Sequence, residues 1–111
     1  PFEAYCGDGP FLLVSYSHAD KGMVFPELLR LRDMQYRIWY DEGIDPGNEW
    51  PEEIAVALSK SSTFVVFISP RSTASQNVRN EINFALNKRK PFLAIHLEET
   101  PLPPRARTSH G

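Results

Sequence analysis

One carboxylate stands out for its position in the stretch SQNVRNEINFALNK, residues 75–88. At about 100° per residue, four apolar residues share one face of a predicted helix: Val78, Ile82, Ala85 and Leu86. Glu81 lies beside this apolar stripe, so we expect it at the edge of the core, not in open water. A carboxylate in such a half-shielded position can be part of a binding or catalytic site. The plainer interpretation is a boundary glutamate that pairs with Lys88.

The chain lacks the motifs of several other kinds of site. Neither G-x-G-x-x-G nor G-x-x-x-x-G-K-[ST] occurs, so no standard phosphate-binding loop is predicted. Ser17, His18 and Asp20 are too close in sequence for a catalytic triad, and G-x-S-x-G is missing. DEGIDPGNE has its carboxylates at the wrong offsets for a calcium loop, so no metal is predicted. A phosphoryl-accepting receiver domain needs acidic residues at the ends of its first and third strands. Here those places hold residues 15–17, Ser-Tyr-Ser, and residues 69–70, Ser-Pro, so this class is excluded.

Four short apolar runs predict β-strands, at residues 11–16, 36–40, 63–69 and 91–97. Three of these runs are continuous, as in strands that are buried on both faces. Helical patterns lie between the runs, at about residues 20–34, 51–60 and 75–88. This alternation predicts an α/β fold, with a doubly wound, mostly parallel sheet and helices on both of its faces.

Ligands of doubly wound sheets bind beyond the carboxyl ends of the strands. Three polar segments follow predicted strands at that edge, residues 15–18, 41–50 and 69–77. Glu81 lies in the first turns of the helix after the third segment, so this topology makes it a wall of the predicted site. Trp50 closes the second segment, either as a hydrophobic staple at the next helix start or as a ligand contact.

The composition is that of one small globular domain. The 111 residues carry a net charge of −2, with 41% apolar and 23% charged residues, which excludes a disordered chain. This charge gives no reason to expect nucleic acid or an anionic membrane as a partner. Cys6 has no second cysteine to pair with, and no apolar run is long enough to span a bilayer. We therefore expect a cytoplasmic protein.

We expect an N-terminal leader over residues 1–9, a folded domain over 10–99 and a Pro-rich tail over 100–111. The first residue is Pro1 and not methionine, which suggests a fragment of a larger protein. The expected sheet is truncated after its fourth strand and has three helices. Part of one face should then lack cover, unless another segment or chain supplies it.

Four segments together resemble a Toll/interleukin-1 receptor (TIR) domain of the bacterial-like type: FLLVSYSHAD, RIWYDEGIDPGNEW, FVVFISPRSTAS, and VRNEINFAL followed by PFLAIHLEE. The resemblance runs from about residue 10 to 99. It implies a flavodoxin-like sheet, identifies residues 41–50 as the BB loop and places Glu81 on the helix called αC. TIR domains serve as self-associating signalling adaptors, or as enzymes that cleave NAD⁺ at the nicotinamide–ribose bond.

For an enzyme, the resemblance implies that Glu81 is the catalytic glutamate and that NAD⁺ is the substrate, with no cofactor and no metal. The implied substrate-binding residues are Ser15, Tyr16, Ser17, Asp41, Trp50 and Asn77. Self-association through the BB loop would use Ile44, Asp45, Pro46 and Gly47. Two departures are visible: enzymatic members often carry tryptophan at the position of Asn77, and the family usually continues into a fifth strand and a last helix.

The sequence therefore leaves three functions open. The first is an NAD⁺ glycohydrolase, or a cyclase, that is activated by self-association in immune-type or cell-death signalling. The second is an adaptor without enzymatic activity, which assembles with other TIR domains. The third is a nucleoside deoxyribosyltransferase, because that class has a related fold and a carboxylate that acts at a sugar carbon.

Overall fold

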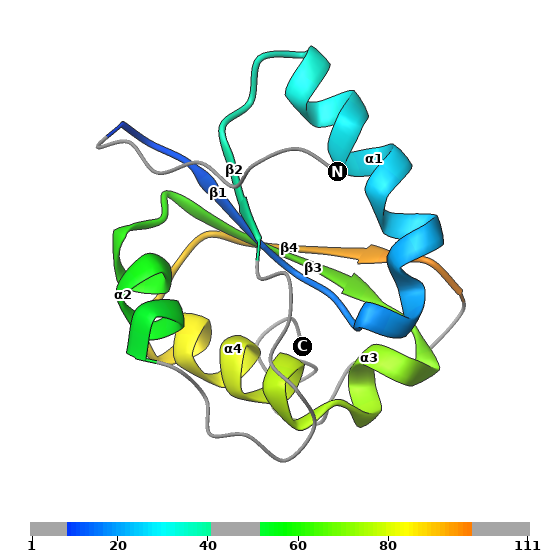
Figure 1. Cartoon of the computed structure of the whole chain (residues 1–111). Helices are drawn as coiled ribbons and strands as arrows, with labels where there is room; N and C mark the ends of the chain where they lie inside the picture. The colour runs from blue at the N-terminus through cyan, green and yellow to red at the C-terminus, as the bar shows by residue number, and fades with distance from the viewer. Residues whose placement is uncertain (1–8, 41–51, 99–111) are drawn as a thin grey trace.

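The computed structural model of the chain describes residues 9–40 and 52–98 (Figure 1). The strands are β1 (Leu12–Ser15), β2 (Ile38–Tyr40), β3 (Thr63–Ile68) and β4 (Phe92–His96). The helices are the 3-10 helix η1 (His18–Asp20), α1 (Lys21–Asp33), α2 (Glu52–Lys60), α3 (Pro70–Ala74) and α4 (Gln76–Asn87). The four predicted strands and the three predicted helices are all present, which confirms the predicted alternation.

The four strands form one parallel sheet in the order β2-β1-β3-β4. The chain leaves β1 toward β2 on one side and returns to β3 on the other, so the order reverses between β1 and β3. Ligand sites of doubly wound folds lie at such a reversal, beyond the carboxyl ends of the strands. In the register of the sheet, Ser15 at the end of β1 lies beside Val66 of β3. This edge is where the predicted site belongs.

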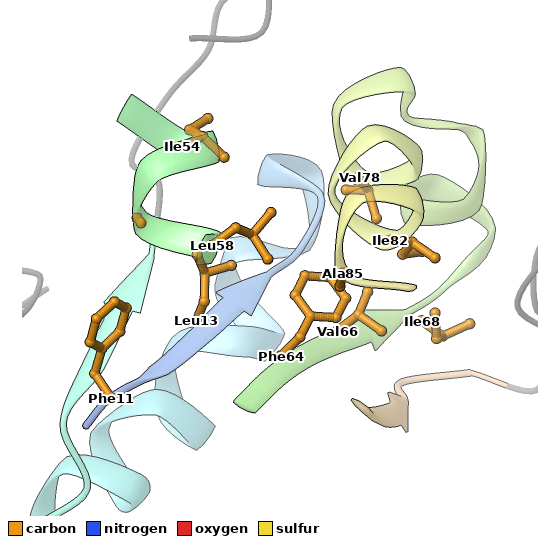
Figure 2. Close-up of a cluster of buried hydrophobic side chains, with 11 residues drawn as sticks. Phe11, Leu13, Ile54, Leu58, Phe64, Val66, Ile68, Val78, Ile82 and Ala85 are labelled. Carbon is orange, nitrogen blue, oxygen red and sulfur yellow. The ribbon is translucent and has the colours of Figure 1, made fainter. Parts of the chain in front are cut away.

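One face of the sheet packs against α2 and α4 (Figure 1). Figure 2 shows Phe64 and Val66 of β3 in this layer, together with Leu58 of α2 and Ile82 of α4. The apolar stripe predicted on α4 faces the sheet here. Its residues Val78, Ile82 and Ala85 are all buried.

The other face packs against α1, through the buried residues Val14, Tyr16, Val24, Leu28, Ile38, Tyr40, Val65 and Phe67. The prediction of helices on both faces is therefore confirmed. On the outer strand β4, Leu93 pairs with Val65 and so lies on the α1 side, yet it is 52% exposed. The expected lack of cover on one face is seen at this position.

Two helical elements were missed by the sequence prediction. η1 precedes α1, and α3 is a separate short helix between β3 and α4. Pro26 lies inside α1. Within residues 9–40 and 52–98, none of the helices combines the length and apolar character that crossing a bilayer requires.

Candidate functional site

Glu81 is a buried residue of α4, with 6% of its surface exposed. It lies next to Ile82 in the sequence and one turn after Val78, and both of these pack in the core under the helix. The prediction that Glu81 flanks the core is confirmed. α4 begins at Gln76, so Glu81 lies in its second turn, near the helix end that adjoins the carboxyl edge of the sheet. A carboxylate is buried in this way only where its surroundings compensate the loss of water around the charge.

Ser15 is the last residue of β1 and is 1% exposed. Successive side chains of a strand point to opposite faces, and Leu13 packs against α2 and α4. Ser15 therefore faces the same side as Leu13, which is the side of α4. Within the described residues its hydroxyl has no hydrogen-bond partner. The structure thus brings a buried hydroxyl and the buried Glu81 to the same face and the same edge of the sheet.

Tyr16 follows Ser15 and points to the opposite, α1 side of the sheet. It is buried there, and its ring centroid lies 5.3 Å from that of His18 and 5.9 Å from that of Phe25. The side chain of Ser17 caps η1 by accepting a hydrogen bond from the backbone N–H of Ala19, at 3.3 Å. Of the three consecutive residues expected at the substrate, Ser15 is the one on the side of Glu81.

Asn77 lies one helical turn before Glu81, in the first turn of α4, and is half-buried. This places its amide beside the carboxylate along the helix. The remaining expected site residues lie outside the described residues: Asp41 and Trp50 for the substrate, and Ile44, Asp45, Pro46 and Gly47 for the BB-loop interface. Among the residues that the structure describes, no three His, Cys, Asp or Glu side chains gather as a metal site requires.

A second polar cluster at the carboxyl edge was missed by the sequence prediction. Asp20, at the end of η1, is 1% exposed, and its carboxylate accepts a hydrogen bond of 2.5 Å from the hydroxyl of Ser69. The second oxygen of that carboxylate accepts a hydrogen bond from Nε of Arg71. Arg71 also donates through Nη2 to the carboxylate of Glu98, just after β4. We call these four residues the Asp20–Arg71 cluster.

The electrostatics of this cluster keep Arg71 charged. Its hydrogen bonds to Glu98 and Asp20 raise the pKa of the Arg71 guanidinium above its ordinary value. A raised pKa stabilises the folded state at every pH below that of the unfolded group, and this stabilisation is lost only above the folded value. Because an arginine pKa lies far above neutral, this contribution does not vary across the physiological range.

Ser69 has two roles that a single substitution removes together. Its side chain caps α3 by accepting from the N–H of Ser72 at 3.1 Å, and its hydroxyl donates to buried Asp20. We expect Ser69→Ala to lower the free energy of unfolding by about 1–3 kcal/mol, since a cap is lost and a buried acceptor loses its donor. Urea denaturation measures this, with exposed Ser59→Ala as the control. Equal stability of both variants would contradict the assignment.

Comparison with known proteins agrees with this architecture. The model of a family described as TIR domain matches residues 12–110. No curated protein matches the chain. The chain resembles the TIR domain of the Toll-related receptor TRR-2 from Hydra magnipapillata with a TM-score of 0.72 and 18% identity, over 86% of this chain and 77% of that one.

It also resembles the TIR domains of the activated Roq1 resistosome, which directly recognises the pathogen effector XopQ. The TM-score is 0.60 and the identity 16%, over 79% of this chain and 57% of that one. At such identities, the two structures show a common fold. The family model extends over nearly the whole chain, including the strand, helix and edge positions described above. The chain belongs to the TIR domain family.

Proposed function

We propose that this TIR domain cleaves NAD⁺ at the bond between nicotinamide and C1′ of the ribose, with Glu81 as the catalytic carboxylate. The observation that carries the proposal is the burial of Glu81 at the carboxyl edge, near the reversal of strand order. In the reaction, the glycosidic electron pair leaves with nicotinamide. Oxygen from water then bonds to C1′, and the products are nicotinamide, ADP-ribose and one proton. In a cyclase, a nucleophile within the substrate would replace water.

A single carboxylate suits this chemistry. The leaving group is a pyridinium that departs as neutral nicotinamide, so the enzyme needs no general acid to protonate it. The positive charge develops instead on the ribose, which becomes oxocarbenium-like. An anionic oxygen from Glu81 can stabilise that charge, or trap the sugar covalently as in retaining glycoside hydrolysis. It can also hold the ribose hydroxyls by charge-assisted hydrogen bonds.

Ser15 and Asn77 are the described residues that we propose beside Glu81 in the substrate site. The Ser15 hydroxyl lies on the α4 side without a partner in the described residues, and so it can bond to a ribose or phosphate oxygen. The amide of Asn77 lies one turn from Glu81. Tyr16 packs on the opposite, α1 side of the sheet and is left out of this wall. Ser17, which follows it, is proposed at the β1 end of the site, and Asp41 and Trp50 are proposed for the rim.

Replacement of Ser15 by alanine should separate stability from binding. Removing a buried hydroxyl that has no partner among the described residues should leave the free energy of unfolding unchanged, or raise it by about 1 kcal/mol. If the hydroxyl binds NAD⁺, KM should rise about tenfold at the same time, in line with one lost hydrogen bond. Denaturation and steady-state kinetics measure the two effects. A large loss of stability with unchanged KM would show a structural hydroxyl.

The proposed activity is tested by incubating the chain with NAD⁺ at a series of protein concentrations and quantifying free nicotinamide by chromatography. Release that increases with protein concentration supports both the activity and its dependence on self-association. No release at any concentration favours an adaptor. Exchange of bases between nucleosides, without turnover of NAD⁺, would indicate a deoxyribosyltransferase instead.

Assembly with other TIR domains is the second candidate function. TIR domains are part of the activated Roq1 resistosome, to which this chain is similar in fold. We propose that the BB loop contributes the contact, through Ile44, Asp45, Pro46 and Gly47, and that both functions are carried out in the cytoplasm. Sedimentation velocity over a range of concentrations should show association that Ile44→Ala weakens. A monomer at all concentrations would exclude this role for the chain.

A further inference from the structure

A single residue connects α3 to α4, the helix that carries Glu81. Ser75 ends α3, because its N–H donates to the carbonyl of Ser72. Its side chain also caps α4 by accepting a hydrogen bond from the N–H of Val78, at 3.3 Å. Its backbone is extended, with φ −79° and ψ 123°. A shift of α3 is therefore transmitted directly to the first turn of α4, one turn before Glu81.

α3 itself has five residues, Pro70–Ala74, too few to be stable as an isolated helix. Its start is fixed by the capping box between Ser69 and Ser72. Beyond this local contact, Arg71 attaches α3 to two distant parts of the chain. It bonds to Asp20, 51 residues earlier, and to Glu98, 27 residues later. Helix η1, α3 and the segment that follows β4 are thus held together at the carboxyl edge.

The reach of Arg71 distinguishes it from Arg30 and Arg79, whose printed partners lie within their own helices. Arg30 pairs with Glu27 within the same helix, at 3.6 Å. Arg79 of α4 donates to Gln76 of the same helix, at 3.0 Å. Such exposed pairs within one helix contribute little to the stability of the fold. Arg71, in contrast, is partly exposed but neutralises a carboxylate, Asp20, that is itself fully buried.

We propose that Arg71 is a positioning residue, which fixes α3 and the first turn of α4 against η1 and β4 and thereby sets the place of Glu81. Arg71 touches neither the substrate nor the reacting atoms in this scheme. It acts through Asp20, whose buried carboxylate it neutralises, so that α3 stays packed against η1. It also acts through Ser75, which connects α3 to α4, so that the position of α3 determines that of the first turn of α4. The activity part of this inference rests on the proposed cleavage of NAD⁺, whereas the structural part does not.

Hydrogen–deuterium exchange tests the structural part on the full chain. In Arg71→Ala, the backbone amides within residues 70–80, of which Pro70 has none, should exchange about tenfold or more faster, while those of β1 and β3 keep their rates. Arg71→Lys should give an intermediate effect. Lysine keeps the positive charge but lacks the planar guanidinium that donates to Asp20 and Glu98 at the same time. Glu98→Ala should show the same effect more weakly, because Asp20 keeps its partners. Arg30→Ala, which removes an exposed local ion pair of α1, is the matched control and should leave the exchange of residues 70–80 unchanged.

Kinetics test the activity part. In Arg71→Ala we expect kcat to fall by about 10- to 100-fold with KM nearly unchanged, because a misplaced catalytic group impairs the reaction more than binding. Arg71→Lys should recover part of kcat. A uniform increase of exchange across the whole chain, or unchanged exchange at 70–80, would overturn the positioning role. So would faster exchange at 70–80 with an unchanged kcat.

The two proposals fail in distinguishable ways. If the wild-type chain releases no nicotinamide under any condition, the proposed function is wrong, and the exchange measurement alone decides whether Arg71 fixes α3 and α4. If the wild-type chain is active and the exchange of residues 70–80 does not respond to Arg71→Ala, the positioning role is wrong. The assignment of Glu81 would then be unaffected.

Discussion

Glu81→Gln should lower the turnover of NAD⁺ by on the order of 100-fold or more, with the fold intact. Glutamine has the shape of glutamate but no negative charge, so it cannot stabilise the oxocarbenium-like ribose. Glu81 is buried at the carboxyl edge, where the surrounding protein screens a charge less than water does. The loss should therefore appear in kcat, measured as nicotinamide released per enzyme at saturating NAD⁺.

Two controls accompany this variant. The free energy of unfolding of Glu81→Gln should stay close to that of the wild type, because glutamine keeps the shape of the side chain and can still form hydrogen bonds. Glu27→Gln, at a partly exposed position of α1, should keep wild-type kcat. Full activity of Glu81→Gln would refute its catalytic role, while an unfolded variant would point to a structural glutamate.

Phe64→Ala should cause the largest loss of stability of the substitutions considered, about 3–5 kcal/mol. Phe64 lies on the interior strand β3, is 0% exposed and packs under α2 and α4 (Figure 2). Its ring centroid is 5.4 Å from that of Phe92. Alanine would leave a cavity that the sheet cannot close, and a small domain has only about 5–15 kcal/mol of stability in total.

Urea denaturation followed by circular dichroism measures this loss. Leu93→Ala on the neighbouring strand β4 is the control, because Leu93 is 52% exposed and its truncation removes little buried surface. We expect that variant to lose less than about 1 kcal/mol. A Phe64→Ala variant as stable as Leu93→Ala would mean that the layer beneath α2 and α4 is not the main core.

Most of the fold could be predicted from the sequence because its strongest signals are local. A continuous apolar run such as residues 63–69 predicts a strand that is buried on both faces, and β3 occupies Thr63–Ile68. The helical spacing of Val24 and Leu28 likewise predicts α1, where both residues are fully buried. Once strands and helices alternate, the right-handed crossover of parallel strands leaves few topologies.

The Asp20–Arg71 cluster could not be predicted in this way, because its members are far apart in the sequence. Ser69 and Arg71 lie 49 and 51 residues from Asp20, and neither spacing leaves a periodic signal. In the sequence Asp20 stands beside Ser17 and His18, whereas in the fold its partners are Ser69, which caps α3, and Arg71 within α3. The short helix α3 was missed for a related reason: five residues are too few to show a period.

The candidate site was predicted in part. The helical pattern placed Glu81 at the edge of the core, and the structure confirms this position. Ser15 and Tyr16 were grouped because they are adjacent, yet alternation along a strand sends them to opposite faces. That separation follows from the pleat as soon as both residues are assigned to the end of one strand. That the Ser15 hydroxyl has no hydrogen-bond partner among the described residues is a tertiary property, which no local sequence pattern indicates.

The most direct test of the central claim is a structure of the chain with an NAD⁺ analogue in which a methylene group replaces the ribose ring oxygen. Such an analogue cannot form an oxocarbenium ion and should remain uncleaved. We predict that a carboxylate oxygen of Glu81 lies within about 3–4 Å of C1′ or of a ribose hydroxyl of the analogue, with Ser15 on the same side. An analogue bound at another surface, or a Glu81 side chain turned away from the ribose, would contradict the account.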